Sequence, residues 1–412
     1  MKKLLFTISL LAFISTGILA QPNDQIVIGT IDTIDSEILG EQRKVWVYVP
    51  DEGPQDLFTK QTYPVVYLLD GDGHFFSVVG MIRQLSTVNG NTICPKMIVV
   101  GIPNTNRTRD LTPTKGTPGH PFVNEAMIAE SGGGQKFMSF LKEELIPHIE
   151  SNYSTAPYRM LIGHSLGGLT VMDAFLKHTD VFNSYVAIDP SMWWSNQQLL
   201  KEIKNTPIDQ KYEGKYLYLG IANTMDEGME LAEVRKSKDP MSEHIRSILD
   251  LDDYLKEKAA PNLKYASNYY PDDSHGSVPL ISEYNALRFF FPFYNLKMGP
   301  QDFMNPDTDL AAKIENHYKV ISKEFGYLVK PEESMLNQMG YQFMGMQLMD
   351  KAGKIFTLNT KYYPESFNTF DSLADYFVAA GEKDKAIESY KKALALNENP
   401  GSREKLEKLQ KE

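Results

Sequence analysis

The clearest chemical signal in this chain is a serine enclosed by glycines. Residues 163–167 read GHSLG and follow the short apolar run 160–162. A helix-compatible segment comes next, so the local order is strand, sharp turn and helix, as in a nucleophile elbow. The glycines leave room for the tight reversal, which predicts that Ser165 is an exposed nucleophile. The backbone amide of Leu166 would then lie at a helix N-terminus, where it can stabilise an oxyanion.

A serine hydroxyl needs a general base, and chain order offers one. His275 lies downstream in a Gly/Ser/Asp-containing loop directly after an apolar run. In α/β-hydrolases the order is serine, acid, histidine, and we expect the acid to be Asp226 or Glu227, which are adjacent in an intervening loop. Asp189, in an earlier loop, is a third candidate. A Ser-His dyad without a carboxylate also stays open.

Other loops that follow buried-strand patterns carry candidate binding groups. Backbone amides at Gly71 and Asp72 are predicted to supply a second oxyanion donor. Arg107 and Arg109 lie beyond the end of another predicted strand, where α/β sheets bind ligands. Either arginine is suited to hold a substrate carboxylate. The equally weighted alternative is an ion pair with Asp110 that staples the loop.

Two adjacent tryptophans follow a further strand pattern. Trp193 and Trp194 are interpreted either as the wall of an acyl or aryl pocket or as core packing. No metal or organic cofactor is predicted, because neither an H-E-x-x-H motif nor a dinucleotide glycine fingerprint occurs in the sequence. The expected partner of the predicted nucleophile is a small-molecule substrate.

Strand and helix patterns alternate across residues 21–297, which predicts an α/β domain with a doubly wound, mostly parallel sheet. Besides the strand that enters the elbow, strands are predicted at residues 27–38, 44–49, 63–69, 97–102, 185–188, 215–222 and 263–270. An amphipathic helix is predicted at residues 135–149, and a helix rich in aromatic residues at 279–291.

A Pro/Gly/Asn-rich stretch, residues 298–307, marks a boundary, and residues 298–330 are interpreted as a linker and connecting helix. In residues 331–412 the triplet DKA at 350–352 recurs at 384–386, a period of 384 − 350 = 34 residues. This period predicts a small all-α domain of tetratricopeptide-like (TPR-like) repeats. Two repeats are few for independent stability, so we expect them to pack on the connecting helix or on the hydrolase domain. Two unrelated helical hairpins are the alternative.

Composition and the N-terminal residues indicate the class of partner and the cellular location. The 412-residue chain has a formal net charge of −11, which argues against a nucleic-acid partner. Residues 1–20 combine Lys2 and Lys3 with an apolar stretch and a plausible cleavage point after Ala20, which predicts a signal peptide and a periplasmic or secreted protein. No membrane span is expected after its removal. The single cysteine, Cys94, excludes an intramolecular disulfide.

Four segments together resemble a known family: YLLDGDGHF, GGGQKFMSFLKEELIPHIE, GHSLGG and PDDSHGSVP. Over roughly residues 25–295 the chain resembles the esterase branch of the α/β-hydrolases that contains siderophore esterases of the ferric enterobactin type and S-formylglutathione hydrolases. The resemblance implies carboxylic-ester hydrolysis, with Ser165 as nucleophile and His275 as base. It also implies an oxyanion hole at Leu166 and near Gly71. Some siderophore esterases in this branch work without a third acidic member.

The sequence therefore predicts an exported serine hydrolase that cleaves carboxylic esters through an acyl-enzyme on Ser165. Transfer of the acyl group to an acceptor other than water is one alternative. The other is an adaptor with weak or no catalysis, whose repeat region binds a protein partner. A siderophore ester, a sugar ester and a small aryl ester all suit the predicted site.

Overall fold

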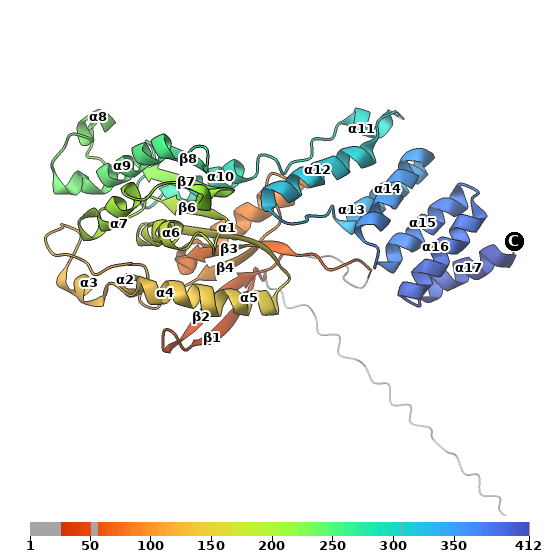
Figure 1. Cartoon of the computed structure of the whole chain (residues 1–412), viewed down its shortest axis with the longest axis horizontal. Coiled ribbons are helices and arrows are strands. Elements are labelled where there is room, and N and C mark those ends of the chain that lie inside the picture. Colours follow the sequence, from red (N-terminus) through yellow and green to blue (C-terminus); the bar gives the residue numbers. More distant parts are fainter. Residues whose placement is uncertain (1–25, 51–56, 306, 412) are drawn as a thin grey trace, which may run out of the picture.

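The computed structural model describes residues 26–50, 57–305 and 307–411, and the predicted signal peptide lies outside these ranges. A mixed sheet of eight strands, in the order β1-β2-β4-β3-β5-β6-β7-β8, forms the centre of the larger part (Figure 1). The strands are β1 (Thr30–Ser36), β2 (Glu41–Tyr48), β3 (Tyr63–Leu69), β4 (Ile98–Ile102), β5 (Thr155–His164), β6 (Ser184–Ile188), β7 (Lys215–Ala222) and β8 (Leu263–Tyr270).

Strands β4, β3, β5, β6, β7 and β8 run parallel, whereas β1 and β2 are antiparallel to their neighbours. Every residue of β3, β4 and β6 is buried. This pattern arises because parallel strands are covered by helices on both faces, so uninterrupted apolar runs are favoured. The predicted bounds of β3, β7 and β8 coincide with the observed ones.

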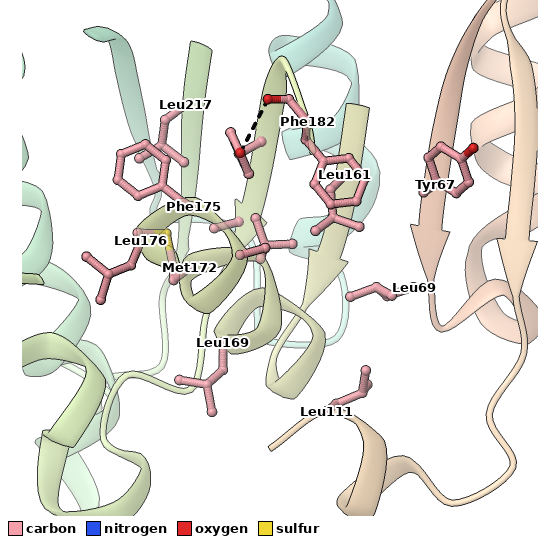
Figure 2. Close-up of a cluster of buried hydrophobic side chains, with 14 of the residues drawn as sticks. Tyr67, Leu69, Leu111, Leu161, Leu169, Met172, Phe175, Leu176, Phe182 and Leu217 are labelled. Carbon is pink, nitrogen blue, oxygen red and sulfur yellow. Dashed lines mark hydrogen bonds between the residues drawn. The ribbon is translucent and has the colours of Figure 1, made fainter. Parts of the chain in front are cut away.

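Two apolar cores lie on opposite faces of the sheet. One core packs α4 (Gly134–Phe140), α5 (Ile146–Asn152), α6 (Leu166–Lys177), α7 (Trp194–Lys204) and α9 (Glu243–Lys258) against the strands. Figure 2 shows part of it, with Leu169, Met172 and Phe175 of α6 near Leu161 and Leu217 of the sheet. The other core is formed with α1 (Gly71–Ser86) and α10 (Val278–Phe290). Shorter helices occupy loops: α2 (Arg107–Asp110), α3 (Glu125–Glu130) and α8 (Leu231–Val234).

The helix predicted at residues 135–149 has an irregularity that the pattern did not reveal. Between α4 and α5 the segment Leu141–Leu145 forms a wider π turn, η2, and the helical run then continues to Asn152. Pro147 lies in the first turn of α5. Because proline has no N–H to donate to the preceding turn, a local change of helix type accommodates it without ending the run.

A purely helical part follows α11 (Pro300–Met304). It begins with α12 (Leu310–Phe325) and continues through α13 (Glu333–Gly345), α14 (Met349–Tyr362), α15 (Phe367–Ala379), α16 (Lys383–Leu396) and α17 (Pro400–Lys411). Figure 1 shows these helices at one end of the molecule. No helix in the described ranges is long and apolar enough to cross a bilayer.

Helix α12 connects the two parts because its ends belong to different cores. Ile321 and Phe325 pack into the sheet core that contains α1 and α10, and the ring centroids of Phe325 and Tyr158 lie 4.9 Å apart. Leu310 and Ile314 pack with α13 and α14. Packing of the C-terminal helices on this connecting helix is what the sequence predicted.

Candidate active site

Ser165 lies in a strained turn between β5 and α6. Its backbone has φ 60° and ψ −116°, a conformation that side-chain-bearing residues rarely adopt. A Cβ atom at Gly163 would lie 2.4 Å from the Gly167 carbonyl oxygen, so only glycine fits at that position. The turn therefore has the predicted elbow geometry, and it presents Ser165 at the carboxyl end of the sheet.

The neighbouring strand places a carboxylate beside the elbow. His164 of β5 pairs with Ile188 of β6, so the residues that follow them, Ser165 and Asp189, emerge side by side. Asp189 is fully buried, and its Oδ1 accepts a 3.0 Å hydrogen bond from the Ala222 amide. Its Oδ2 lies 2.6 Å from Nδ1 of His275, in the loop after β8. Three strand ends thus meet at one carboxylate.

A second histidine contacts the same carboxylate oxygen. Nε2 of His244, in the first turn of α9, lies 2.8 Å from Asp189 Oδ2. Burial favours the neutral acid, but the hydrogen bonds from His244 and His275 outweigh it and hold the pKa of Asp189 well below its usual range. Asp189 is therefore an anion with hydrogen-bond donors from two imidazoles and one backbone amide.

The preference for Asp226 or Glu227 as the acid was wrong in geometric terms. Both residues are exposed in the loop after β7, and the carboxylate that binds His275 is Asp189. Asp189 follows β6, which is adjacent to the elbow strand β5, so it emerges beside Ser165, whereas β7 is one strand farther from the elbow. Asp226 lines the pocket at the site but is not bonded to the imidazole in the described hydrogen-bond network.

A cavity of about 420 Å³ opens beside the elbow. Its lining includes Ser165, Leu166, Ser191, His244, His275, Arg107, Phe122, Met127, Trp193 and Asp226. Within the described residues, Ser165 Oγ has one hydroxyl neighbour, Ser191 Oγ at 3.4 Å, and no hydrogen bond to His275. Serine–histidine bonds in empty sites are often long and tighten when substrate binds.

The two candidate arginines have different surroundings. Arg107 lines the cavity and forms a bidentate ion pair with Asp70, at 2.7 Å and 2.9 Å. Arg109 binds Glu41 at 2.6 Å and Asp110 at 2.7 Å, and it is absent from the cavity lining of the described chain. For Arg109 the loop-stapling alternative therefore describes the structure, and of the two arginines Arg107 is the one at the cavity.

The tryptophans also differ. Trp193 lines the cavity, and its indole stacks on the His120 ring with centroids 4.0 Å apart and an interplanar angle of 9°. Trp194 is 2 % exposed and donates from Nε1 to the Thr114 carbonyl at 3.0 Å. Both side chains belong to the core on the α6 face, and Trp193 is 6% exposed. The pocket interpretation therefore suits Trp193 in addition to core packing, whereas core packing alone describes Trp194.

Backbone amides stand at two helix N-termini near the serine. Leu166 is the first residue of α6, and Gly71 and Asp72 are the first residues of α1. Asp70, the residue before α1, lies against the elbow. Its Oδ2 is 3.1 Å from the position that a Cβ atom would take at Gly167. Leu166 lines the cavity, whereas neither Gly71 nor Asp72 is part of its described lining.

Asp189, His244 and His275 also bring their polar atoms within 4.8 Å of one another, close enough to share a metal ion. Both imidazole nitrogens face the same carboxylate oxygen at hydrogen-bond distance. This arrangement is satisfied by proton donation to an anion, so the geometry does not require a metal.

Comparisons with known proteins bear on this site. A family model described as "Putative esterase" matches residues 36–229. The ferri-bacillibactin esterase BesA of Bacillus subtilis is 29% identical over 238 residues, which cover 55% of this chain and 78% of the relative. These matches support a carboxylic ester hydrolase. The predicted class of enzyme is thereby confirmed.

Solved structures extend the likeness of this esterase beyond the sheet. A structure described as an IroE-like serine hydrolase from Shewanella oneidensis has a TM-score of 0.66 and 29% identity, covering 81% of this chain and 99% of its own. An uncharacterised protein from Capnocytophaga ochracea has a TM-score of 0.57 over 93% of this chain and 99% of its own, at 18% identity. The second likeness concerns the fold alone.

Sequence reasoning overlooked His244 and Ser191. Ser191 directly follows Asp189-Pro190, so its place near the site could have been predicted if Asp189 had been taken as the acid. His244 lies 55 residues from Asp189, at the start of an amphipathic helix with no glycine or motif beside it. Its position depends on how α9 packs on the sheet, which no local pattern encodes.

Proposed function

We propose that the esterase works through a serine nucleophile, with Ser165, His275 and Asp189 as its catalytic triad. The Ser165 hydroxyl attacks the ester carbonyl while Nε2 of His275 accepts its proton. Asp189 fixes the tautomer with the proton on Nδ1 and stabilises the imidazolium. His275 then returns the proton to the departing alcohol, and water cleaves the acyl-enzyme by the same steps in reverse.

The observation that carries the proposal is the 2.6 Å bond between Asp189 and His275 at the cavity that Ser165 lines. A base that is held by a buried carboxylate near a serine in an elbow matches the roles required for acyl transfer. The amide of Leu166 supplies one oxyanion donor in this proposal, and an amide of Gly71 or Asp72 supplies the other.

Covalent labelling tests the mechanism. A fluorophosphonate probe is expected to label the wild-type chain, and Ser165→Ala is expected to abolish both labelling and hydrolysis of short-chain esters. Ser191→Ala is the matched control, because Ser191 lines the same cavity 3.4 Å from Ser165 and should leave labelling in place. Labelling of the Ser165→Ala chain would refute the mechanism.

The substrate proposed is a siderophore-type ester, with sugar and aryl esters as competitors. The support is the similarity to BesA, a ferri-bacillibactin esterase, and the partly apolar wall at Phe122, Met127 and Trp193. Arg107 borders the cavity with its charge balanced by Asp70, so it is suited to orient a polar group of the substrate. Comparing kcat/KM for the three ester classes tests the choice, and a preference for sugar esters would contradict it.

At the N-terminus we propose a signal peptide that directs export and is cleaved after Ala20. At the C-terminus we propose a TPR-like arrangement of α13 to α16. Supporting the repeat, α15 starts 367 − 333 = 34 residues after α13, and α16 starts 383 − 349 = 34 after α14. Such helix pairs suit a protein partner. Mass spectrometry of the N-terminus of the mature protein tests export, and a pull-down with the full chain tests partner binding.

A further inference from the structure

We propose that His244 is a positioning residue that sets the basicity of His275 through the carboxylate that the two imidazoles share. The inference rests on the proposed serine mechanism, because it concerns the proton affinity of the base in that mechanism. It assigns a role to a residue that is outside the triad and that has no signature in the sequence.

The geometry makes Asp189 Oδ2 a shared acceptor. His275 Nδ1 approaches it at 2.6 Å and His244 Nε2 at 2.8 Å, and the two rings lie edge to face with centroids 5.2 Å apart. An ionised carboxylate can only accept hydrogen bonds, so both nitrogens carry protons. His244 is thereby fixed as the Nε2–H tautomer when it is neutral, and His275 as the Nδ1–H tautomer.

This assignment distinguishes the two histidines. His275 keeps Nε2 for the substrate, and its side chain is 42% exposed. The side chain of His244 is 9% exposed, its Nε2 is engaged by Asp189, and its Nδ1 is buried without a hydrogen-bond partner in the described part of the chain. No nitrogen of His244 is therefore placed to exchange a proton with an ester, so its effect must pass through Asp189.

The effect follows from charge. Asp189 stabilises the imidazolium of His275, and this stabilisation grows with the negative charge that remains on Oδ2. A hydrogen bond from His244 compensates part of that charge. It also anchors the carboxylate so that Oδ2 points at His275. Removal of the donor should leave more negative charge facing His275, so that His275 becomes protonated at a higher pH.

Other titratable groups near the pair do not replace this contact. The His164 and His275 ring centroids are 4.4 Å apart, and His164 is neutral because burial lowers its pKa to about 4. Glu243 precedes His244, and its carboxylate lies 3.7 Å from His120 and accepts a bond from Gln197. Asp226 stands exposed in the cavity lining. In the described hydrogen-bond network the side-chain donors to Asp189 are His244 and His275.

The acid limb of the pH profile of kcat/KM provides the test, since it reports protonation of the base in the free enzyme. His244→Phe and His244→Met both remove the donor, and each should move the acid limb upward by about one pH unit. His244→Gln keeps an N–H near the Nε2 position, so its limb should stay close to that of the wild type. His178→Phe, at the far end of α6, should leave the limb unmoved.

A purely structural role for His244 would lower kcat at every pH without moving the limb, and that result in a folded apolar variant would overturn the proposal. A limb shifted equally in His244→Gln would also overturn it. Histidine ¹⁵N NMR of the wild-type chain gives an independent check: the Nε2–H tautomer of His244 is expected at neutral pH, and the Nδ1–H tautomer would contradict it. Hydrolysis that survives in Ser165→Ala would instead refute the serine mechanism itself.

Discussion

Nδ1 of His275 lies 2.6 Å from Oδ2 of Asp189, although 86 residues separate the two in the chain. The contact exists because β6 and β8 both end at the edge where the elbow strand ends. Burying an anion costs desolvation free energy, which several hydrogen-bond donors must compensate, and here the anion also holds an imidazole in one orientation. Its presence beside Ser165 is therefore the strongest structural sign of acyl-transfer chemistry.

Asp189→Asn should lower kcat by roughly 10³–10⁴-fold with little change of fold, because the asparagine amide can donate where His275 must also donate, which favours the wrong imidazole tautomer. Asp226→Asn is the matched control, since Asp226 is exposed and lines the same cavity. It should retain kcat within about twofold, as expected for a surface carboxylate. Steady-state kinetics on one ester distinguishes the two, and the reverse ranking would restore the assignment of Asp226 as the acid.

Trp193→Ala and Trp194→Ala should differ in their main effect, which is on substrate binding for the first and on fold stability for the second. Loss of the Trp193 indole opens the cavity wall and should raise KM roughly tenfold, as expected for about 1–3 kcal/mol of lost apolar contact. Loss of the buried Trp194 side chain should instead destabilise the fold by about 3–5 kcal/mol. Chemical denaturation and substrate kinetics on both variants check this. A large stability loss in Trp193→Ala with unchanged KM would contradict the placement of Trp193 in the wall.

Gly163→Ala should abolish activity or folding, because the added Cβ would lie 2.4 Å from the Gly167 carbonyl oxygen. Gly80→Ala, in the middle of α1 and with open space around it, should instead stabilise the fold by roughly 0.5–1 kcal/mol. Activity and thermal unfolding of the two purified variants form the comparison. An active Gly163→Ala enzyme would show that the elbow is less constrained than its geometry indicates.

Glu283 of α10 should make the fold less stable as pH rises. Its side chain is 2% exposed, its Oε2 has no hydrogen-bond partner in the described residues, and burial raises its pKa to about 8. Because the folded state holds a proton that the unfolded state releases at lower pH, the free energy of unfolding falls between the ordinary glutamate pKa and the raised one.

Glu283→Gln retains the shape without the titrating proton. The variant and the wild type should unfold alike near pH 5, and the variant should be more stable by up to a few kcal/mol at pH 8. Urea denaturation at the two pH values measures the difference. Equal stability of the variant and the wild type at both pH values would contradict the prediction, because it would mean that the carboxyl is ionised in the folded state.

Local pattern was enough to predict Ser165 and His275 as neighbours in one site. The strand–turn–helix pattern around Ser165 and the loop with His275 are both visible in the local sequence. The alternation of strands and helices predicts that the two residues lie at the carboxyl edge of one sheet. The acid was not predictable in this way, because Asp189 and Asp226 both follow buried strands. Sheet order does not decide between them either, because β7 lies closer to β8 than β6 does. The choice depends on how the loops fold, which leaves Asp226 exposed and buries Asp189 against His275.

Side-chain pairing sets a further limit. Arg107 and Arg109 are two residues apart on one loop, yet Asp70 holds the first at the cavity and Glu41 holds the second away from it. Both acids lie far from the arginines in sequence, so only the contact of Arg109 with the adjacent Asp110 could be foreseen from spacing. His244 is a similar case, since its contact with Asp189 is set by where α9 packs.

The shared helix α12 has a consequence for how the chain melts. Its C-terminal residues complete the apolar layer over Tyr158 and Phe291, while its N-terminal residues complete the layer under α13 and α14. A helix that frays from one layer loses support in the other, so heat should disrupt both parts in a single calorimetric transition. A chain cut after residue 297 would leave the aromatic surface under α12 facing water and should aggregate, rather than survive as a smaller enzyme.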